Sequence, residues 1–273
     1  MLSMGTLDGH VAVVVGGHSG FGLEITRLFA AEGATVVVAG RRMELVNDVA
    51  ASVGGLGVDC DITDDDQVQA LVGAAIDAYG KVTLAVNCAG YEQSTAIAEL
   101  TPQKLDAMLA VQLSGALYCM RHLGNAMAAG GGGAFLSISS LTAHNPSRGL
   151  AAYASAKAGI EYATKIAAVE YGAQQVRFNT VAASLIETPM TERIFRFEPA
   201  IQALREVTPL GRMGSSADIA QAALFLCGPH ANYITGQTVC VDGGASLQML
   251  PSPQMFADVH RRWTEAQATK DSG

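Results

Sequence analysis

Three polar side chains in the middle of the chain have the types and spacing for acid–base chemistry. Tyr153 precedes Lys157 by four residues in the alanine-rich stretch LAAYASAKAGIEYATK, so on a helix both point the same way, about one turn apart. A free phenol titrates near pH ~10, and a neighbouring ammonium favours the phenolate and lowers that pKa. Ser140 ends the run AFLSISS and can donate a hydrogen bond to a substrate oxygen that exchanges a proton with Tyr153. The trio therefore predicts proton transfer coupled to hydride transfer.

Short apolar runs alternate with helical patterns, and these elements must position the three side chains. Strands are predicted for five runs rich in Val, Ile and Leu, at 11–16, 35–40, 82–87, 134–139 and 176–181. They do not alternate with polar residues, which is typical of strands buried on both faces of a parallel sheet. Apolar spacing predicts helices at 22–33 and 64–80. The β-α-β order predicts an α/β fold with a doubly wound parallel sheet, whose strand carboxyl ends bring Ser140 and Tyr153 to one crevice.

A glycine-rich turn follows the first predicted strand. In VGGHSGFG, Gly16, Gly20 and Gly22 lie between that strand and an amphipathic helix. Such a turn lets the backbone approach a pyrophosphate, and the N–H groups and dipole at the helix N-terminus attract its charge. The context favours dinucleotide binding over a merely tight turn.

The end of the second strand bears on the choice of nicotinamide cofactor. In VVVAGRR no carboxylate is available for the ribose hydroxyls of NAD, and Arg41 is placed to hold the 2′-phosphate of NADP. We therefore favour NADP(H), with NAD(H) as the alternative. Alternatively, one or both arginines belong to the solvated start of a helix, Arg42 more readily than Arg41. Asp61 is predicted to accept a hydrogen bond from the adenine amino group. Alternatively, Asp61 or Thr63 caps the next helix.

Composition limits the classes of partner. The net charge of −8 and the pI near 5.2 argue against a nucleic-acid or anionic-membrane partner. No apolar run approaches the ~18 to 20 residues of a membrane span, and the N-terminus has no signal-peptide pattern, so we expect a cytoplasmic protein. Five cysteines without Cys-x-x-Cys are read as free, mostly buried thiols, with a redox role for Cys60 and Cys88 as the alternative. No ligand spacing indicates a metal.

Together these residues resemble the short-chain dehydrogenase/reductases of the roughly 250-residue type. VGGHSGFG is similar to the family's cofactor loop, DIT at 61–63 to its adenine contact and NCAG at 87–90 to its strand-stabilising motif. The segments at 177–190 and 234–246 extend the likeness over nearly the whole chain. The resemblance implies a Rossmann-like sheet of about seven strands with helices on both faces. It implies a catalytic trio of Ser140, Tyr153 and Lys157, and cofactor contacts from Gly16, His18, Ser19, Gly20, Phe21, Gly22, Arg41, Arg42, Asp61, Ile62, Asn87, Ala89, Gly90, Tyr153, Lys157, Ile186 and Thr188.

The chain departs from the family pattern at four places. Val15 stands where the cofactor loop begins with Thr, and Cys88 replaces the second Asn of the strand motif. Gln112 occupies the place of a catalytic Asn that organises a proton relay; it carries the same amide one methylene further out, and we retain it as a catalytic candidate. Ala183 and Ser184 replace the Pro-Gly that follows the sixth strand, so a different turn is expected there.

Substrate recognition is expected to lie in segments that vary between members of the family. Residues 185–210 are the expected lid of a single catalytic domain at 1–250, followed by a helical, docked extension at 251–273. The predicted substrate pocket, for an apolar or ring-containing compound, comprises Tyr91, His144, Ile194 and Phe195. The alternative is that these side chains pack against their own domain.

Several functions remain open at this point. The leading one is an NADP-linked oxidoreductase that interconverts a secondary alcohol and a ketone, with Tyr153 as general acid/base. The alternatives are a 3-oxoacyl-thioester reductase and a catalytically weak nucleotide-binding sensor. A purely structural protein is disfavoured, because three polar residues at one crevice would have no role. Partners are expected to be a small molecule and further copies of the chain, as a homotetramer or homodimer built on helices at about 101–129 and 151–172.

Overall fold

A parallel sheet forms the centre of the molecule. The computed structural model describes residues 5–247 and 261, so the predicted C-terminal extension lies, apart from Arg261, outside the described residues. The sheet is seven-stranded with the order β3-β2-β1-β4-β5-β6-β7, which confirms the predicted doubly wound, Rossmann-like α/β fold. Its strands are β1 (Val11–Val15), β2 (Thr35–Gly40), β3 (Leu56–Asp59), β4 (Leu84–Asn87), β5 (Gly133–Ser140), β6 (Val176–Ala183) and β7 (Thr238–Val241).

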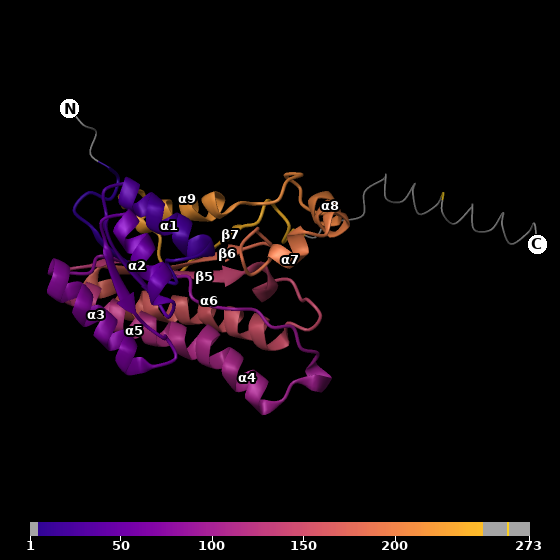
Figure 1. The fold of residues 1–273 in the computed structure, drawn as a ribbon, viewed down its shortest axis with the longest axis horizontal. Coiled ribbons are helices and arrows are strands. Elements are labelled where there is room, and N and C mark those ends of the chain that lie inside the picture. Colours follow the sequence, from indigo (N-terminus) through magenta and orange to yellow (C-terminus); the bar gives the residue numbers. More distant parts are fainter. Residues whose placement is uncertain (1–4, 248–260, 262–273) are drawn as a thin grey trace, which may run out of the picture.

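Helices cover both faces of the sheet (Figure 1). They are α1 (Gly20–Ala31), α2 (Met43–Ser52), α3 (Asp65–Tyr79), α4 (Pro102–Leu109), α5 (Gly115–Ala129), α6 (Ala151–Tyr171), α7 (Glu192–Phe195), α8 (Glu198–Glu206) and α9 (Ser216–Cys227). The face covered by α1 and α9 buries Phe29 and Leu226, whereas the face covered by α3, α5 and α6 buries Leu71, Leu123 and Phe178. Both faces of the central strands are therefore apolar, which explains why their sequences do not alternate.

The strand order reverses between β1 and β4. From β1 the chain first proceeds outward to β2 and β3, then returns to β4 on the other side of β1. The helices that follow the two halves diverge there and leave a crevice at the carboxyl ends of the strands. The glycine-rich turn after β1 and the segment after β4 meet at this point.

The predicted helix at about 101–129 is divided in the structure. Between α4 and α5, residues Ala110–Ser114 form a wider π-helical turn that contains the buried Gln112. Such turns often occur at functional sites. The helix predicted at 151–172 is continuous as α6.

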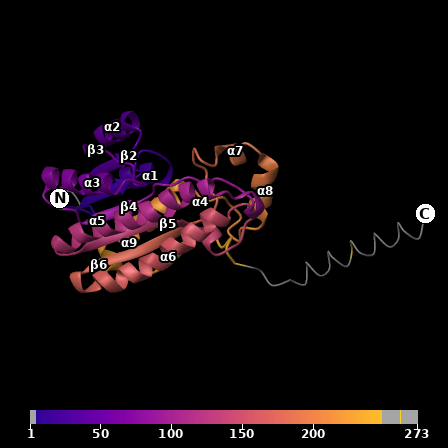
Figure 2. The same ribbon diagram turned by 90° about the horizontal axis from the view of Figure 1, so that it is seen from below.

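The segment expected to be a lid forms two short helices. Figures 1 and 2 both place α7 and α8 together, beyond the carboxyl ends of the strands. Ile201 of α8 is buried, while Phe197 between the helices is exposed. No helix within residues 5–247 has the length and hydropathy of a membrane span.

The cysteines agree with the sequence-based prediction. All five are free; Cys60, Cys119 and Cys227 are buried, Cys88 is half-buried and Cys240 is exposed. Burial raises the pKa of Cys60 and of Cys88 to about 12, so both remain thiols at neutral pH. This disfavours the alternative of a redox role, because the thiolate is the reactive form.

Candidate active site

One cavity of about 840 Å³ joins the glycine-rich turn to the carboxyl ends of β5 and β6. It brings together segments that are far apart in the sequence, as the predicted crevice requires. The predicted site residues that line it are Gly16, His18, Ser19, Gly20, Phe21, Arg41, Arg42, Asp61, Ile62, Ala89, Gly90, Tyr91, Ser140, Tyr153, Ile186, Thr188 and Ile194.

The glycine-rich turn has the shape of a phosphate cradle. Gly16 and Gly20 adopt φ of +76° and +52°, and a Cβ atom on Gly22 would lie 2.2 Å from the carbonyl oxygen of Gly16. Ser19, at the start of α1, makes no side-chain cap hydrogen bond, so the first N–H groups of α1 are not used by it. The turn therefore fits a dinucleotide pyrophosphate, which needs close backbone approach and a helix N-terminus.

The two arginines at the end of β2 have different partners in the structure. Arg42 faces the glycine-rich turn: its Nε donates to His18 Nε2 at 3.0 Å and its Nη2 to Ser19 Oγ at 3.1 Å. Arg41 instead pairs with Asp61 at 3.5 Å, with 70% of its side chain exposed. Arg42 is thus exposed at the start of α2, as the alternative for the arginines expected, and its donors also face the glycine-rich turn.

His18 is held between Arg42 and the end of β2. A Cβ atom on Gly40 would lie 2.6 Å from the His18 ring, so glycine is needed there for the ring to pack. Burial, and then the Arg42 charge, lowers the pKa of His18, so the ring is neutral at neutral pH and accepts from Arg42. His18 Nδ1 is buried without a partner among the described residues.

Asp61 does not cap α3, and neither does Thr63. Asp61 accepts from the N–H and the hydroxyl of Thr63, whereas Asp64 accepts from the N–H groups of Asp66 and Gln67 and caps the helix. Asp61 lines the cavity, where Arg41 also pairs with it.

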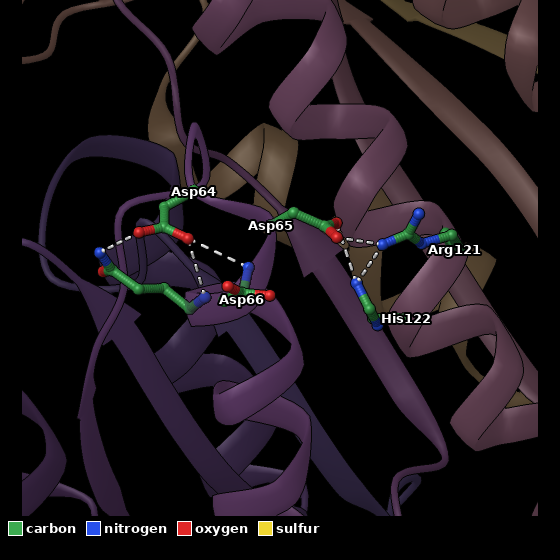
Figure 3. A network of polar contacts seen from close by, with 6 residues as sticks. Asp64, Asp65, Asp66, Arg121 and His122 are labelled. Carbon is green, nitrogen blue, oxygen red and sulfur yellow. Dashed lines mark hydrogen bonds and ion pairs between the residues drawn. The ribbon is translucent and has the colours of Figure 1, made fainter.

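The acidic run after Asp61 has a structural role (Figure 3). Asp65 pairs with Arg121 and lies 3.0 Å from His122 Nε2, both on α5. The pairs link the start of α3 to the middle of α5. The run DDD therefore caps and anchors α3 outside the cavity.

Ser140 and Tyr153 line the cavity, and Lys157 is buried beside Tyr153. Ser140 ends β5, accepts a hydrogen bond from the N–H of Thr142 at 3.2 Å, and hydrogen-bonds to Tyr153. Lys157 Nζ lies 5.6 Å from the centroid of the Tyr153 ring and donates to the carbonyl oxygen of Ile138 at 2.8 Å. The helix and the strand thus place all three polar groups together, as the spacing predicted.

The pKa of Tyr153 shifts in the direction opposite to the prediction. Burial raises it, the hydrogen bond with Ser140 opposes this, and the Glu92 carboxylate raises it further. The net shift is upward because burial is the largest of these effects. Burial also lowers the pKa of Lys157 to about 8, opposed by Cys88 and Glu161. At neutral pH the site therefore holds a protonated phenol beside an ammonium.

Gln112 lies beneath the segment that follows β4. Its side chain is buried, its Nε2 donates to the carbonyl oxygen of Tyr91, and its Oε1 has no partner among the described residues. A Cβ atom on Gly90 would lie 2.9 Å from the Gln112 amide. Asn87 Oδ1 accepts from the N–H of Ala89 at 3.1 Å. The side-chain amides of Gln112 and Asn87 thus hold the backbone that forms the cavity wall. Neither side chain lines the cavity itself.

The predicted substrate pocket is partly corrected. Tyr91 and Ile194 line the cavity, but His144 and Phe195 do not. His144 turns toward Glu161, with Nε2 3.1 Å from Oε2, and Phe195 packs half-buried in the short helix α7. The orientation of a loop histidine or of a four-residue helix does not follow from residue spacing, so these two side chains could not be placed from the sequence.

The cavity is also lined by residues that were not predicted from the sequence. Glu92 acts electrostatically on Tyr153, and Asn145, Arg148 and Leu204 also line the cavity. They lie in loops and at a helix end, where no spacing pattern marks a site residue. Within the described residues no group of His, Cys, Asp or Glu is arranged to hold a metal ion.

Comparison with known proteins gives a consistent result. Residues 15–246 match the family profile described as enoyl-(acyl carrier protein) reductase. The chain is 33% identical over 243 residues to a 3-oxoacyl-(acyl-carrier-protein) reductase from Thermotoga maritima, covering 87% of this chain and 98% of that protein. It is 34% identical over 252 residues to a 7alpha-hydroxysteroid dehydrogenase from Escherichia coli strain K12, covering 89% of this chain and 96% of that protein.

A solved structure agrees with this result. A short-chain type dehydrogenase/reductase from Mycobacterium ulcerans superposes with a TM-score of 0.85 at 30% identity, covering 90% of this chain and 93% of that chain. The family match at residues 15–246 spans the glycine-rich turn and the strand and helix that carry Ser140, Tyr153 and Lys157. The chain belongs to the short-chain dehydrogenase/reductase family.

Proposed function

We propose that the chain is an NADP(H)-linked oxidoreductase that interconverts a secondary alcohol and a ketone. The observation that carries the proposal is that Ser140 and Tyr153 line the cavity that begins at the glycine-rich turn, with the buried Lys157 beside the Tyr153 ring. The nicotinamide cofactor of this family supplies the hydride when bound. The chain itself supplies a proton donor and acceptor, a hydrogen-bond donor and a positive charge.

Each member of the trio has a role in this proposal. Tyr153 exchanges a proton with the substrate oxygen, and Ser140 donates a hydrogen bond to that oxygen as charge develops on it. Lys157 lies behind the Tyr153 ring, where its charge stabilises a phenolate once the proton has left. Because burial keeps Tyr153 protonated at neutral pH, its resting form is ready for reduction of a ketone.

NADP(H) is favoured by the residues after β2. Residues 40–42 include no carboxylate, and Arg42 lies beside Ser19 at the edge of the glycine-rich turn. We therefore assign to Arg42 the contact with the 2′-phosphate of NADP that the sequence predicts for Arg41. Arg41 has an exposed ion pair with Asp61, and such pairs stabilise little, so it remains available as a second donor.

An apolar or ring-containing substrate fits the remaining wall. Side chains of Tyr91, Leu141, Leu150, Met190 and Ile194 line this end of the cavity. Apolar side chains in the wall of the cavity that holds Tyr153 favour a cyclic ketone over a small hydrophilic one. Similarity to a hydroxysteroid dehydrogenase supports the same class.

Reduction of a 3-oxoacyl thioester is the second candidate. It is favoured by the 33% identity to the Thermotoga maritima reductase. The net charge of −8 opposes an acidic carrier protein as the substrate carrier, because like charges repel.

The test is NADPH oxidation with a panel of cyclic, aromatic and aliphatic ketones and acetoacetyl-coenzyme A. Turnover of cyclic ketones in preference to the thioester supports the proposal. Preferential turnover of the thioester supports the second candidate. Tight NADPH binding without turnover of any compound contradicts both and supports a sensor.

A further inference from the structure

A third functional group lies on the same face of α6 as the proposed catalytic pair. Glu161 follows Lys157 by four residues and Tyr153 by eight, and the residue is only 9% exposed. Burying a carboxylate is costly unless it is paired and hydrogen-bonded. Its contacts therefore indicate what the buried charge does.

Both carboxylate oxygens of Glu161 are bound to the segment around Ser140. Ser139 Oγ donates to Oε1 at 2.6 Å, and His144 Nε2 lies 3.1 Å from Oε2. Ser139 directly precedes Ser140, and His144 follows the short turn that Ser140 begins. Glu161 thus ties both sides of Ser140 to the helix that carries Tyr153 and Lys157.

Glu161 is also the anion that faces Lys157. The titratable groups around the ammonium are Cys88 after β4 and Tyr153 and Glu161 on α6. Burial raises the pKa of Cys88 to about 12, so this thiol is uncharged at neutral pH. Tyr153 is a neutral phenol under the same conditions.

Two groups face Glu161 from other elements. His144 approaches it from the turn after β5, and Cys240 from β7. Burial raises the pKa of Cys240, which therefore adds no charge at neutral pH. Among the described residues, Glu161 is left as the negative group beside Lys157.

We propose that Glu161 is a positioning residue with two effects. It keeps Lys157 charged, and it holds Ser140 in place beside Tyr153. The inference rests on the proposed function, because it assigns Glu161 a part in the same site. Loss of the carboxylate charge removes the attraction that opposes burial of the ammonium. Lys157 then loses its proton at a lower pH, and the phenolate loses its counter-charge.

A purely structural role for Glu161 predicts a different result when only its charge is removed. If Glu161 only fastens the turn, an uncharged side chain of the same size and with an acceptor oxygen suffices. Glu161→Gln meets that description, since its amide oxygen still accepts from Ser139. Glu170→Gln is the matched control, because it removes the same charge from an exposed position on the same helix.

The experiment follows Lys157 directly by NMR of the full-length protein labelled with ¹³Cε-lysine. The chain has five lysines, and Lys157→Arg identifies the Lys157 signal. We expect Glu161→Gln to lower the Lys157 titration midpoint by about one pH unit, and Glu170→Gln to leave it unchanged. The high-pH fall of NADPH-dependent ketone reduction should move by the same amount and in the same direction.

A reciprocal measurement does not depend on the folding of Glu161→Gln. Because the coupling between two sites is mutual, Lys157→Met must make the Glu161 carboxyl keep its proton to a higher pH, by the same amount. This is read from ¹³Cδ-glutamate signals. An unmoved Lys157 midpoint in folded Glu161→Gln, or an unmoved Glu161 signal in Lys157→Met, overturns the inference. A wild-type protein without turnover counts against the proposed function, while the NMR titrations still decide the role of Glu161.

Discussion

The candidate site contains a few residues whose pKa values are shifted by burial. Residue types and the four-residue spacing of Tyr153 and Lys157 were enough to predict that they lie together. The direction of the Tyr153 pKa was predicted incorrectly, because that direction depends on how deeply the fold buries the phenol. A sequence motif shows which groups meet but not the environment in which they meet.

Arg42 is predicted to recognise the 2′-phosphate of NADPH more strongly than Arg41. Arg42→Ala removes charge-assisted hydrogen bonds beside Ser19, which should weaken NADPH binding about 10- to 100-fold and NADH binding much less. Arg41→Ala, whose guanidinium pairs with Asp61, is the matched control and should have a smaller effect. Calorimetric titration of both cofactors measures this. Equal losses for NADPH and NADH would show that Arg42 does not read the phosphate.

The buried ammonium of Lys157 is predicted to lower the stability of the fold. Burial lowers the pKa from its ordinary value of 10.5 to about 8. Below pH 8 the folded state carries the full cost, about 3 kcal/mol, and the cost disappears as pH rises toward 10.5. Lys157→Met should therefore raise the free energy of unfolding at pH 7 by about 1–2 kcal/mol, since the hydrogen bond to Ile138 is lost as well.

Urea unfolding at several pH values measures this effect. The advantage of Lys157→Met over wild type should shrink between pH 8 and pH 10, because only the wild type gains stability there. Lys165→Met, at an exposed position of α6, is the control and should change little. An advantage that does not depend on pH would rule out this origin.

Elements were predicted best where they are most apolar. The buried central strands and the helices α1, α3 and α6 have clear patterns. In contrast, β3 and β7 are short edge strands with half-exposed residues, so they give weak apolar runs. The π turn at Gln112 and the short lid helices depend on contacts between distant segments. Local periodicity does not contain that information.

The start of α3 offers a test at the scale of one element. Asp64→Ala removes the side chain that accepts from two N–H groups of the first turn and should lower stability by about 1 kcal/mol. Asp66→Ala removes the same charge two residues later without removing the cap. Thermal unfolding of both variants compares them. Equal destabilisation would mean that charge, and not capping, matters there.

At the scale of the whole molecule, α5 and α6 present an apolar face to solvent. Leu117, Tyr162, Ile166 and Val169 are exposed there, with Val169 84% exposed. Exposed apolar patches on a helix pair favour contact with another copy of the chain. These are the helices that the family resemblance implied for a homodimer or homotetramer.

Val169→Asp is predicted to weaken self-association, because a buried unpaired carboxylate at an interface is unfavourable. Light scattering should show a smaller average mass than for wild type. Leu45→Asp, on α2 over the opposite sheet face, is the control and should keep the wild-type mass. A monomeric wild type, or an unchanged mass for Val169→Asp, would contradict assembly through this face.

The central claim is that Tyr153 exchanges a proton with a ketone or alcohol in a site that also binds NADPH. The most direct measurement compares wild type and Tyr153→Phe for NADPH-dependent ketone reduction and for NADPH binding by fluorescence. The claim predicts that Tyr153→Phe loses at least about 100-fold in kcat while its Kd for NADPH changes little. Retained turnover in Tyr153→Phe would contradict it.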